Sequence, residues 1–244
     1  MQTIELLALA LAPIIFIFTF VYLRDKYDRE PLKYLIVTFI LGVFTAAPVI
    51  YIGEWLREIT GTSAEAGNLW DLVIYAFLVV ATTEEGMKYL VLRWYNYPHR
   101  EFDEPYDGIM YGVAVSLGFA AIENVLYVFG ADGTGVQTGI VRMFTAVPAH
   151  AAFGVMCGYF VGKAKFLHGE GNPFLERMKG LAVAILFHGL YDFFLFIGDE
   201  FLGLFAFVSL LVALVLARKA MKDHVAISPH RYGKSQPPSD SDPS

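Results

Sequence analysis

Long apolar runs alternate with short polar segments along most of this chain. A helix that crosses a membrane needs about 20 consecutive, mostly apolar residues. Seven segments meet this requirement, at approximately residues 4–23, 34–56, 70–92, 107–129, 139–161, 180–197 and 201–217. The pattern predicts an all-α polytopic membrane protein with about seven transmembrane helices.

Basic residues collect in every second loop of this arrangement. Fifteen of the 18 lysines and arginines fall there, namely Arg24, Lys26, Arg29, Lys33, Arg93, Arg100, Lys163, Lys165, Arg177, Lys179, Arg218, Lys219, Lys222, Arg231 and Lys234. The opposite loops hold only Arg57, while Lys88 and Arg142 lie inside spans. Since basic residues accumulate in short cytoplasmic loops, we expect the N-terminus outside and the C-terminus in the cytoplasm. The first span lacks the flanks of a signal peptide, so we expect it to be retained.

The composition agrees with a membrane protein and excludes other classes. Hydrophobic residues make up 56% of the chain and charged residues 17%, at a mean hydropathy of +0.52. The basic residues form no patch interleaved with aromatics, and the net charge is −6, so a nucleic-acid partner is not expected. We expect one helical domain over residues 1–222 and a disordered cytoplasmic tail over 223–244, which is rich in Ser, Pro and Asp.

Several ionisable residues lie where the bilayer makes them costly. A charge at the bilayer centre costs ~2.5–3.5 kcal/mol even on a lenient insertion scale. The third to sixth spans nevertheless contain Glu84, Glu85, Lys88, Glu123, Asn124, Arg142, His150, His188 and Asp192. The other three spans hold no comparable group in their middle. The third to sixth spans are therefore the expected functional bundle.

The spacing of these residues predicts which side chains meet. Glu84 and Lys88 are four residues apart and share a helix face, as do His188 and Asp192. Adjacent Glu84 and Glu85 point about 100° apart, which suggests different roles. Counting about 1.5 Å per residue from the cytoplasmic end places Glu84 and His188 about 12 Å deep and Glu123 at roughly 20–25 Å.

Two further expectations concern the fifth span and the chemistry. Arg142 lies near the outer end of its span, where we expect its long side chain to extend to the membrane surface.

A glutamate removed from water is a competent general base for a hydrolytic water, and a nearby histidine can donate to a developing oxyanion. Glu123, His150 and His188 are also candidate ligands for zinc, although an HExxH motif is absent.

The order of the motifs resembles one family. EExxK at Glu84, Glu85 and Lys88, FxxxEN from Phe119 to Asn124, His150 in PAHAAFG and HxxxD from His188 to Asp192 follow one another on successive helices. This series, over roughly residues 71–194, is similar to that of the PrsW family of bacterial intramembrane proteases, relatives of the type II CAAX prenyl endopeptidases. Lys88 and Glu123 favour the PrsW branch, since the CAAX enzymes typically have EExxxR and FxxxH.

The resemblance implies an intramembrane endopeptidase that hydrolyses a membrane-anchored protein, with residues 1–222 as a protease domain. Its catalytic residues would be Glu84, Glu85, Glu123, His150, His188 and Asp192, supported by Lys88, Phe119 and Asn124. Regulated proteolysis of an anti-sigma-factor-like protein is the activity known in the family. A glutamic mechanism and a zinc-dependent one both stay open. The alternatives are a non-catalytic membrane scaffold, a CAAX-type prenyl-protein endopeptidase and a proton-coupled transporter.

Overall fold

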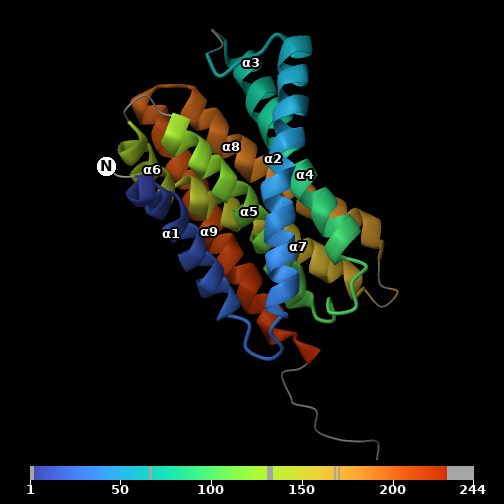
Figure 1. The fold of residues 1–244 in the computed structure, drawn as a ribbon. Helices are drawn as coiled ribbons and strands as arrows, with labels where there is room; N and C mark the ends of the chain where they lie inside the picture. Colours follow the sequence, from blue (N-terminus) through green and yellow to red (C-terminus); the bar gives the residue numbers. More distant parts are fainter. Residues whose placement is uncertain (1–2, 66–67, 131–133, 168, 170, 230–244) are drawn as a thin grey trace, which may run out of the picture.

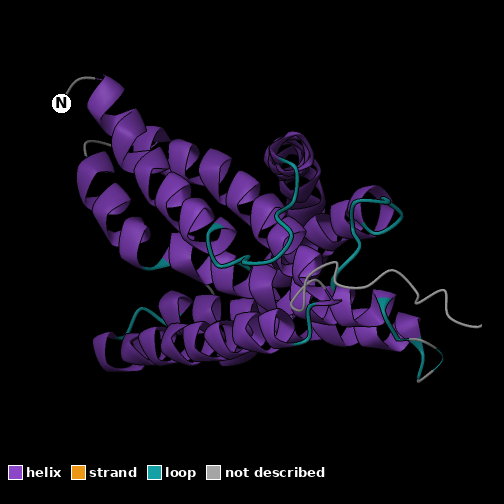
Figure 2. Ribbon diagram, turned by 90° about the horizontal axis from the view of Figure 1, so that it is seen from below, coloured by secondary structure: helices purple, strands orange, loops and turns teal. Residues whose placement is uncertain are grey.

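The described part of the chain is built from helices. The computed structural model describes residues 3–65, 68–130, 134–167, 169 and 171–229, which contain no strand (Figure 2). The elements are α1 (Thr3–Tyr22), α2 (Leu32–Thr60), α3 (Leu69–Val73), the π-helix η1 (Ile74–Thr82), α4 (Thr83–Val91), the π-helix η2 (Leu92–Asn96), α5 (Pro105–Gly130), α6 (Gly135–Phe144), α7 (Ala146–Lys165), α8 (Pro173–Phe196) and α9 (Glu200–Ala226) (Figure 1).

These helices match the predicted spans. Among the described residues, six helices are long and apolar enough to cross a membrane: α1, α2, α5, α6 with α7, α8 and α9. The remaining predicted span is an unbroken helical run from Leu69 to Asn96, which is divided into α3, η1, α4 and η2. The outer faces of α1, α2 and α9 expose large apolar side chains such as Phe16, Phe44 and Val215, as expected where lipid is the solvent. The predicted fold class is confirmed.

Helices α5 and α7 form the centre of the bundle. Helix α5 packs against α1, α2 and α7, while α7 also packs against α8 and α9 (Figure 1). Every residue of α5 from Pro105 to Ala121 is buried.

Small residues bring α5 and α7 close together. A Cβ atom added to Gly112 would collide with the backbone carbonyl of Gly154, and one added to Gly158 would collide with that of Gly108. Such small-residue contacts let the backbones of membrane helices approach closely. His150 precedes Gly154 by one turn on the same face of α7, so the close approach also carries His150 to α5.

Two local irregularities position the polar residues. The wide turns of η1 end at Thr82, two residues before Glu84, and the Thr82 hydroxyl donates to the Phe77 carbonyl at 2.7 Å. Such π-helical turns shift the register of the residues that follow them. The second irregularity is Thr145, whose φ of −122° and ψ of −78° separate α6 from α7. Arg142 and His150 therefore lie on two helices that can be oriented independently.

Helix α9 continues past the expected domain boundary at residue 222. It ends at Ala226, and the ring of His224 stacks on Tyr159 with centroids 4.2 Å apart. After the end of α9, the Ser228 hydroxyl donates a hydrogen bond to the Glu104 carboxylate. The chain therefore packs against the bundle as far as Ser228, because the side chains of His224 and Ser228 have partners there. The rest of the predicted tail, residues 230–244, lies outside the described residues.

Candidate active site

Three charged residues of α4 form the centre of a buried polar cluster. The Lys88 ammonium donates to Glu84 Oε2 at 3.2 Å and to Glu85 Oε1 at 2.8 Å, and all three side chains are buried. Although adjacent residues of a helix point about 100° apart, the side chains of Glu84 and Glu85 both reach the Lys88 ammonium. Lys88 is four residues after Glu84 and three after Glu85, and both separations bring side chains together on a helix.

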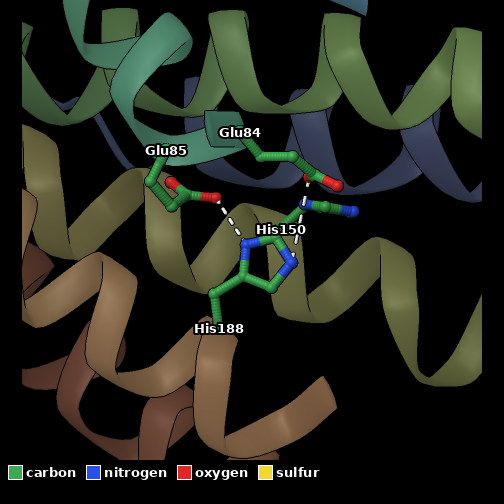
Figure 3. Close-up of side chains that lie close together, drawn as sticks. All are labelled: Glu84, Glu85, His150 and His188. Carbon is green, nitrogen blue, oxygen red and sulfur yellow. Dashed lines mark hydrogen bonds and ion pairs between the residues drawn. The ribbon is translucent and has the colours of Figure 1, made fainter. Parts of the chain in front are cut away.

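Helix α8 contributes His188 and Asp192 to the same cluster. His188 Nδ1 lies 2.9 Å from Glu85 Oε1, and its Nε2 lies 3.2 Å from Asp192 Oδ2 and 3.8 Å from Glu84 Oε2. Figure 3 shows the carboxylates of Glu84 and Glu85 pointing from α4 toward this imidazole. Because both ring nitrogens face carboxylates, His188 satisfies both contacts only as a doubly protonated imidazolium.

His150 links α4 to α5. Its Nδ1 lies 3.2 Å from the Lys88 ammonium and its Nε2 lies 2.8 Å from Glu123 Oε2. An ammonium can only donate, so Nδ1 accepts the hydrogen bond from Lys88, and Nε2 carries the proton that is donated to Glu123. With this bond, Lys88 uses all three of its donors. The contact also brings Glu123 into the cluster, although residue counting placed it much deeper, because counting ignores helix tilt and side-chain length.

Arg142 holds the far side of Glu123. Its Nη2 donates to Glu123 Oε2 at 2.6 Å and its Nε donates to Asn124 Oδ1 at 2.7 Å. The Asn124 amide donates in turn to the Ala10 carbonyl at 3.1 Å. The expectation that Arg142 extends to the membrane surface is therefore wrong, because α6 ends two residues later and packs Arg142 against α5.

Aromatic rings enclose the cluster. The Lys88 ammonium lies 4.2 Å from the centroid of the Phe119 ring, at a distance that gives a favourable cation–π contact. The Phe153 ring stacks on His188 with centroids 5.1 Å apart. Phe153 was not singled out from the sequence. Its position three residues after His150 could have identified it, because residues with that spacing share a helix face.

The charges of the cluster do not balance when both imidazoles are neutral. Four carboxylates, those of Glu84, Glu85, Glu123 and Asp192, face two permanent cations, Lys88 and Arg142. Two negative charges remain. Since unpaired buried charges are costly, either added protons or one divalent cation must offset them.

The donor atoms also fit a metal ion. Glu84, Glu85, His150 and His188 each offer one ligand atom, and these atoms lie within 4.8 Å of one another. Nitrogen from two histidines with carboxylate oxygen is a donor set that zinc accepts. Glu123, which was expected in this set, lies outside this group of donor atoms, and Arg142 and His150 engage the same oxygen of its carboxylate. Lys88 contacts three of the four donors, so its ammonium would have to move away from an incoming ion.

Comparisons with known proteins identify the family of this chain. The model of the PrsW family of intramembrane metalloproteases matches residues 30–217. Two proteins called Protease PrsW, from Geobacillus kaustophilus and Bacillus subtilis, are 36% and 37% identical, over 82% and 78% of this chain and 85% and 82% of their own. The chain belongs to the PrsW family. Another Protease PrsW, from Clostridioides difficile, is 34% identical over 80% of each chain. No solved structure matches.

Membership in the PrsW family makes the protein a membrane-embedded peptidase that acts on a protein substrate. The family match spans every residue of the polar cluster, from Glu84 on α4 to Asp192 on α8. The description of the family as metalloproteases agrees with the converging donor atoms of Glu84, Glu85, His150 and His188.

Proposed function

We propose that this PrsW-family protein hydrolyses a peptide bond of a membrane-anchored protein, with Glu84 as the general base. The observation that carries this assignment is the unequal engagement of the two glutamates. Glu85 accepts close hydrogen bonds from Lys88 and His188, at 2.8 and 2.9 Å, whereas Glu84 meets them at 3.2 and 3.8 Å. The Glu84 side chain is also the more accessible, at 9% exposed against 2%.

Glu84 would activate water in the usual way of a buried carboxylate. It takes a proton from the water while the water oxygen forms a bond to the scissile carbonyl carbon. The carbonyl oxygen then carries the negative charge of a tetrahedral intermediate. When the carbon–nitrogen bond breaks, the leaving nitrogen takes the proton back from Glu84. Glu85, which is held by Lys88 and His188, has the role of a positioning residue.

His188 is the proposed donor to the developing oxyanion. Its Nε2 points at Asp192 and toward Glu84, so a carbonyl beside Glu84 lies within its reach. Asp192 orients the ring and stabilises its positive charge, which is the usual task of a carboxylate one turn from a histidine. Glu123 and His150 act through Lys88 by holding its ammonium in place.

As an alternative to these metal-free roles of Glu84 and His188, the converging donors support a zinc ion in the same place. We propose Glu84, Glu85, His150 and His188 as the residues that would hold it, with Lys88 displaced. A bound zinc ion would polarise the scissile carbonyl and acidify the attacking water. Arg142 would still hold Glu123 on the other side of His150.

The proposed substrate is a protein with a single membrane span. Regulated cleavage of an anti-sigma-factor-like protein is an activity of this kind. The alternation of basic loops supports an orientation with the N-terminus outside and the C-terminus in the cytoplasm. The peptide bond would then be cut in the cytoplasmic half of the membrane or beside it.

The experiment is cleavage of a single-span substrate by the purified full-length protein. Glu84→Gln removes the proton acceptor but keeps the shape of the side chain, so the rate should fall by about 10²–10⁴-fold. Glu85→Gln keeps an oxygen that accepts from Lys88, and it should cause the smaller loss. His188→Ala should abolish cleavage. Glu58→Gln, on the exposed surface of α2, is the matched control and should cleave normally.

The unfolding midpoint of each variant shows whether it has folded. Full cleavage by Glu84→Gln and His188→Ala would exclude this site as the catalytic centre. A larger loss in Glu85→Gln than in Glu84→Gln would instead assign the base to Glu85.

A further inference from the structure

A second group of buried carboxylates lies at one end of the bundle, away from the peptidase site. Asp25 lies between α1 and α2, and Glu104 and Asp107 lie at the start of α5, each with 1% of its surface exposed. One oxygen from each of the three carboxylates lies within 4.8 Å of the other two.

Backbone and side-chain contacts hold this cluster in place. Asp107 Oδ2 accepts hydrogen bonds from the backbone amides of Asp103 and Glu104, at 2.8 and 2.7 Å. The carboxylate of Glu104 bonds to the hydroxyl of Ser228, which follows α9. The cluster therefore joins three segments that are distant in the sequence: the α1–α2 loop, the start of α5 and the residues after α9.

Glu30 adds a fourth buried carboxylate with an oxygen left over. It is 3% exposed, and its Oε2 accepts a hydrogen bond from the Tyr111 hydroxyl at 2.5 Å. Its Oε1, like Oδ2 of Asp25, is buried and has no hydrogen-bond partner among the described residues. The pKa of both carboxyls is raised to about 7, chiefly by burial, and for Asp25 the neighbouring carboxylate of Glu104 contributes to this rise. Leaving such oxygens without a partner is costly.

The basic side chains nearby are engaged elsewhere. Lys165 donates to the backbone carbonyls of Tyr97 and His99, at 2.7 and 2.9 Å. Arg29 donates at 3.2 Å to the backbone carbonyl of Asp25, and not to its carboxylate. Within the described residues no salt bridge reaches Asp25, Glu30 or Asp107. The peptidase cluster differs, because Lys88 and Arg142 partner its carboxylates.

We propose that Asp25, Glu104 and Asp107 bind one divalent cation of the Mg²⁺ or Ca²⁺ class, with Glu30 beside them. Hard cations prefer oxygen ligands. This cluster offers only carboxylate oxygens, whereas the peptidase cluster also offers histidine nitrogens. The bound ion offsets the buried negative charge and ties the α1–α2 loop to α5. Its role is structural, and it is independent of the proposed catalytic groups.

Calcium binding to the purified full-length protein tests this site. Ca²⁺ is the probe because the histidines of the other cluster disfavour it. Equilibrium dialysis should give one Ca²⁺ per chain, and Mg²⁺ should compete. The unfolding midpoint should rise by about 5–10 °C between chelator and saturating Ca²⁺.

Variants assign the binding to these residues. Asp25→Asn and Glu104→Gln should lose both the bound Ca²⁺ and the rise in midpoint. In chelator they should unfold at or above the wild-type temperature, because each removes a buried charge. Asp28→Asn, on the exposed surface of the same loop, is the matched control and should keep the ion, as should His188→Ala at the peptidase site. Absence of Ca²⁺ and Mg²⁺ binding at millimolar concentration, or binding that survives Asp25→Asn, would overturn the proposal.

Discussion

The charged side chains of the peptidase site form one continuous series of hydrogen bonds and ion pairs across α6, α5, α7, α4 and α8. In order, its members are Arg142, Glu123, His150, Lys88, the pair Glu84 and Glu85, His188 and Asp192. Donors and acceptors alternate along it, so each proton position follows from its neighbours. Because each residue shares its hydrogen bonds with the next one, a change of charge at one residue alters the charge balance of the whole series.

Measuring the zinc content distinguishes the two states proposed for His188, a zinc ligand and a protonated hydrogen-bond donor. As a metal ligand it offers a lone pair, whereas as an imidazolium it donates to Glu85 and Asp192. We expect about one zinc per purified chain, lost together with cleavage activity on treatment with 1,10-phenanthroline. His188→Ala and His150→Ala should each lower the bound zinc.

His99→Ala is the control for this measurement, because the His99 ring contacts Tyr34 and Tyr95 and is not among the converging donors. It should retain zinc. A zinc-free wild-type protein that cleaves at its full rate would contradict metal binding and leave His188 as the oxyanion donor.

The pairs that lie one helical turn apart were predictable from the sequence. The pairing of Glu84 with Lys88, and of His188 with Asp192, follows from helical periodicity alone. The contact of Arg142 with Glu123 was not predictable, because it depends on where α6 ends and on how α6 packs on α5. The contacts between His150 and Lys88 and between Glu85 and His188 likewise depend on tertiary packing.

The tight crossing of α5 and α7 makes Gly158 sensitive to the smallest substitution. Gly158→Ala would place a methyl group against the backbone carbonyl of Gly108, which has no way to rotate aside. Overpacking of this kind costs about 1–3 kcal/mol, and we expect a lower unfolding midpoint in detergent. Cleavage should weaken as well, because α7 carries His150.

Gly203→Ala is the matched control for that substitution. Gly203 lies within α9, and a Cβ atom there meets no atom within 4 Å. Alanine should therefore be neutral or stabilising, by up to about 1 kcal/mol from helix propensity. Equal midpoints for the two alanine variants would contradict the proposed close packing of α5 on α7.

Hydropathy predicted the spans well, because a bilayer requires apolar length in every crossing helix. It did not predict how the helical run from Leu69 to Asn96 is divided. The π-helical turns of η1 depend on local backbone bonds, such as that of Thr82 to Phe77, which leave no mark in the apolar pattern. The break at Thr145 was also missed, since both α6 and α7 are apolar.

The molecule contains two acidic clusters that differ in composition and in position. The one between the helices contains histidines and basic partners, and it belongs to the proposed peptidase chemistry. The other, at Asp25, Glu104 and Asp107, contains oxygen donors and lies where three segments of the chain meet. Metal removal should therefore affect cleavage through the first cluster and folded stability through the second, which makes zinc-selective and calcium-selective treatments distinguishable.

The orientation of the bundle can be tested with single cysteines, because the natural Cys157 is buried. Glu65→Cys lies in the α2–α3 loop, and Arg100→Cys lies in the loop before α5; both positions are exposed. If basic loops face the cytoplasm, a membrane-impermeant maleimide added to intact cells should label Glu65→Cys and leave Arg100→Cys unlabelled. Both variants should react after the membrane is opened, while the wild-type protein should not. Labelling of Arg100→Cys alone in intact cells would reverse the orientation and place the Asp25 cluster outside.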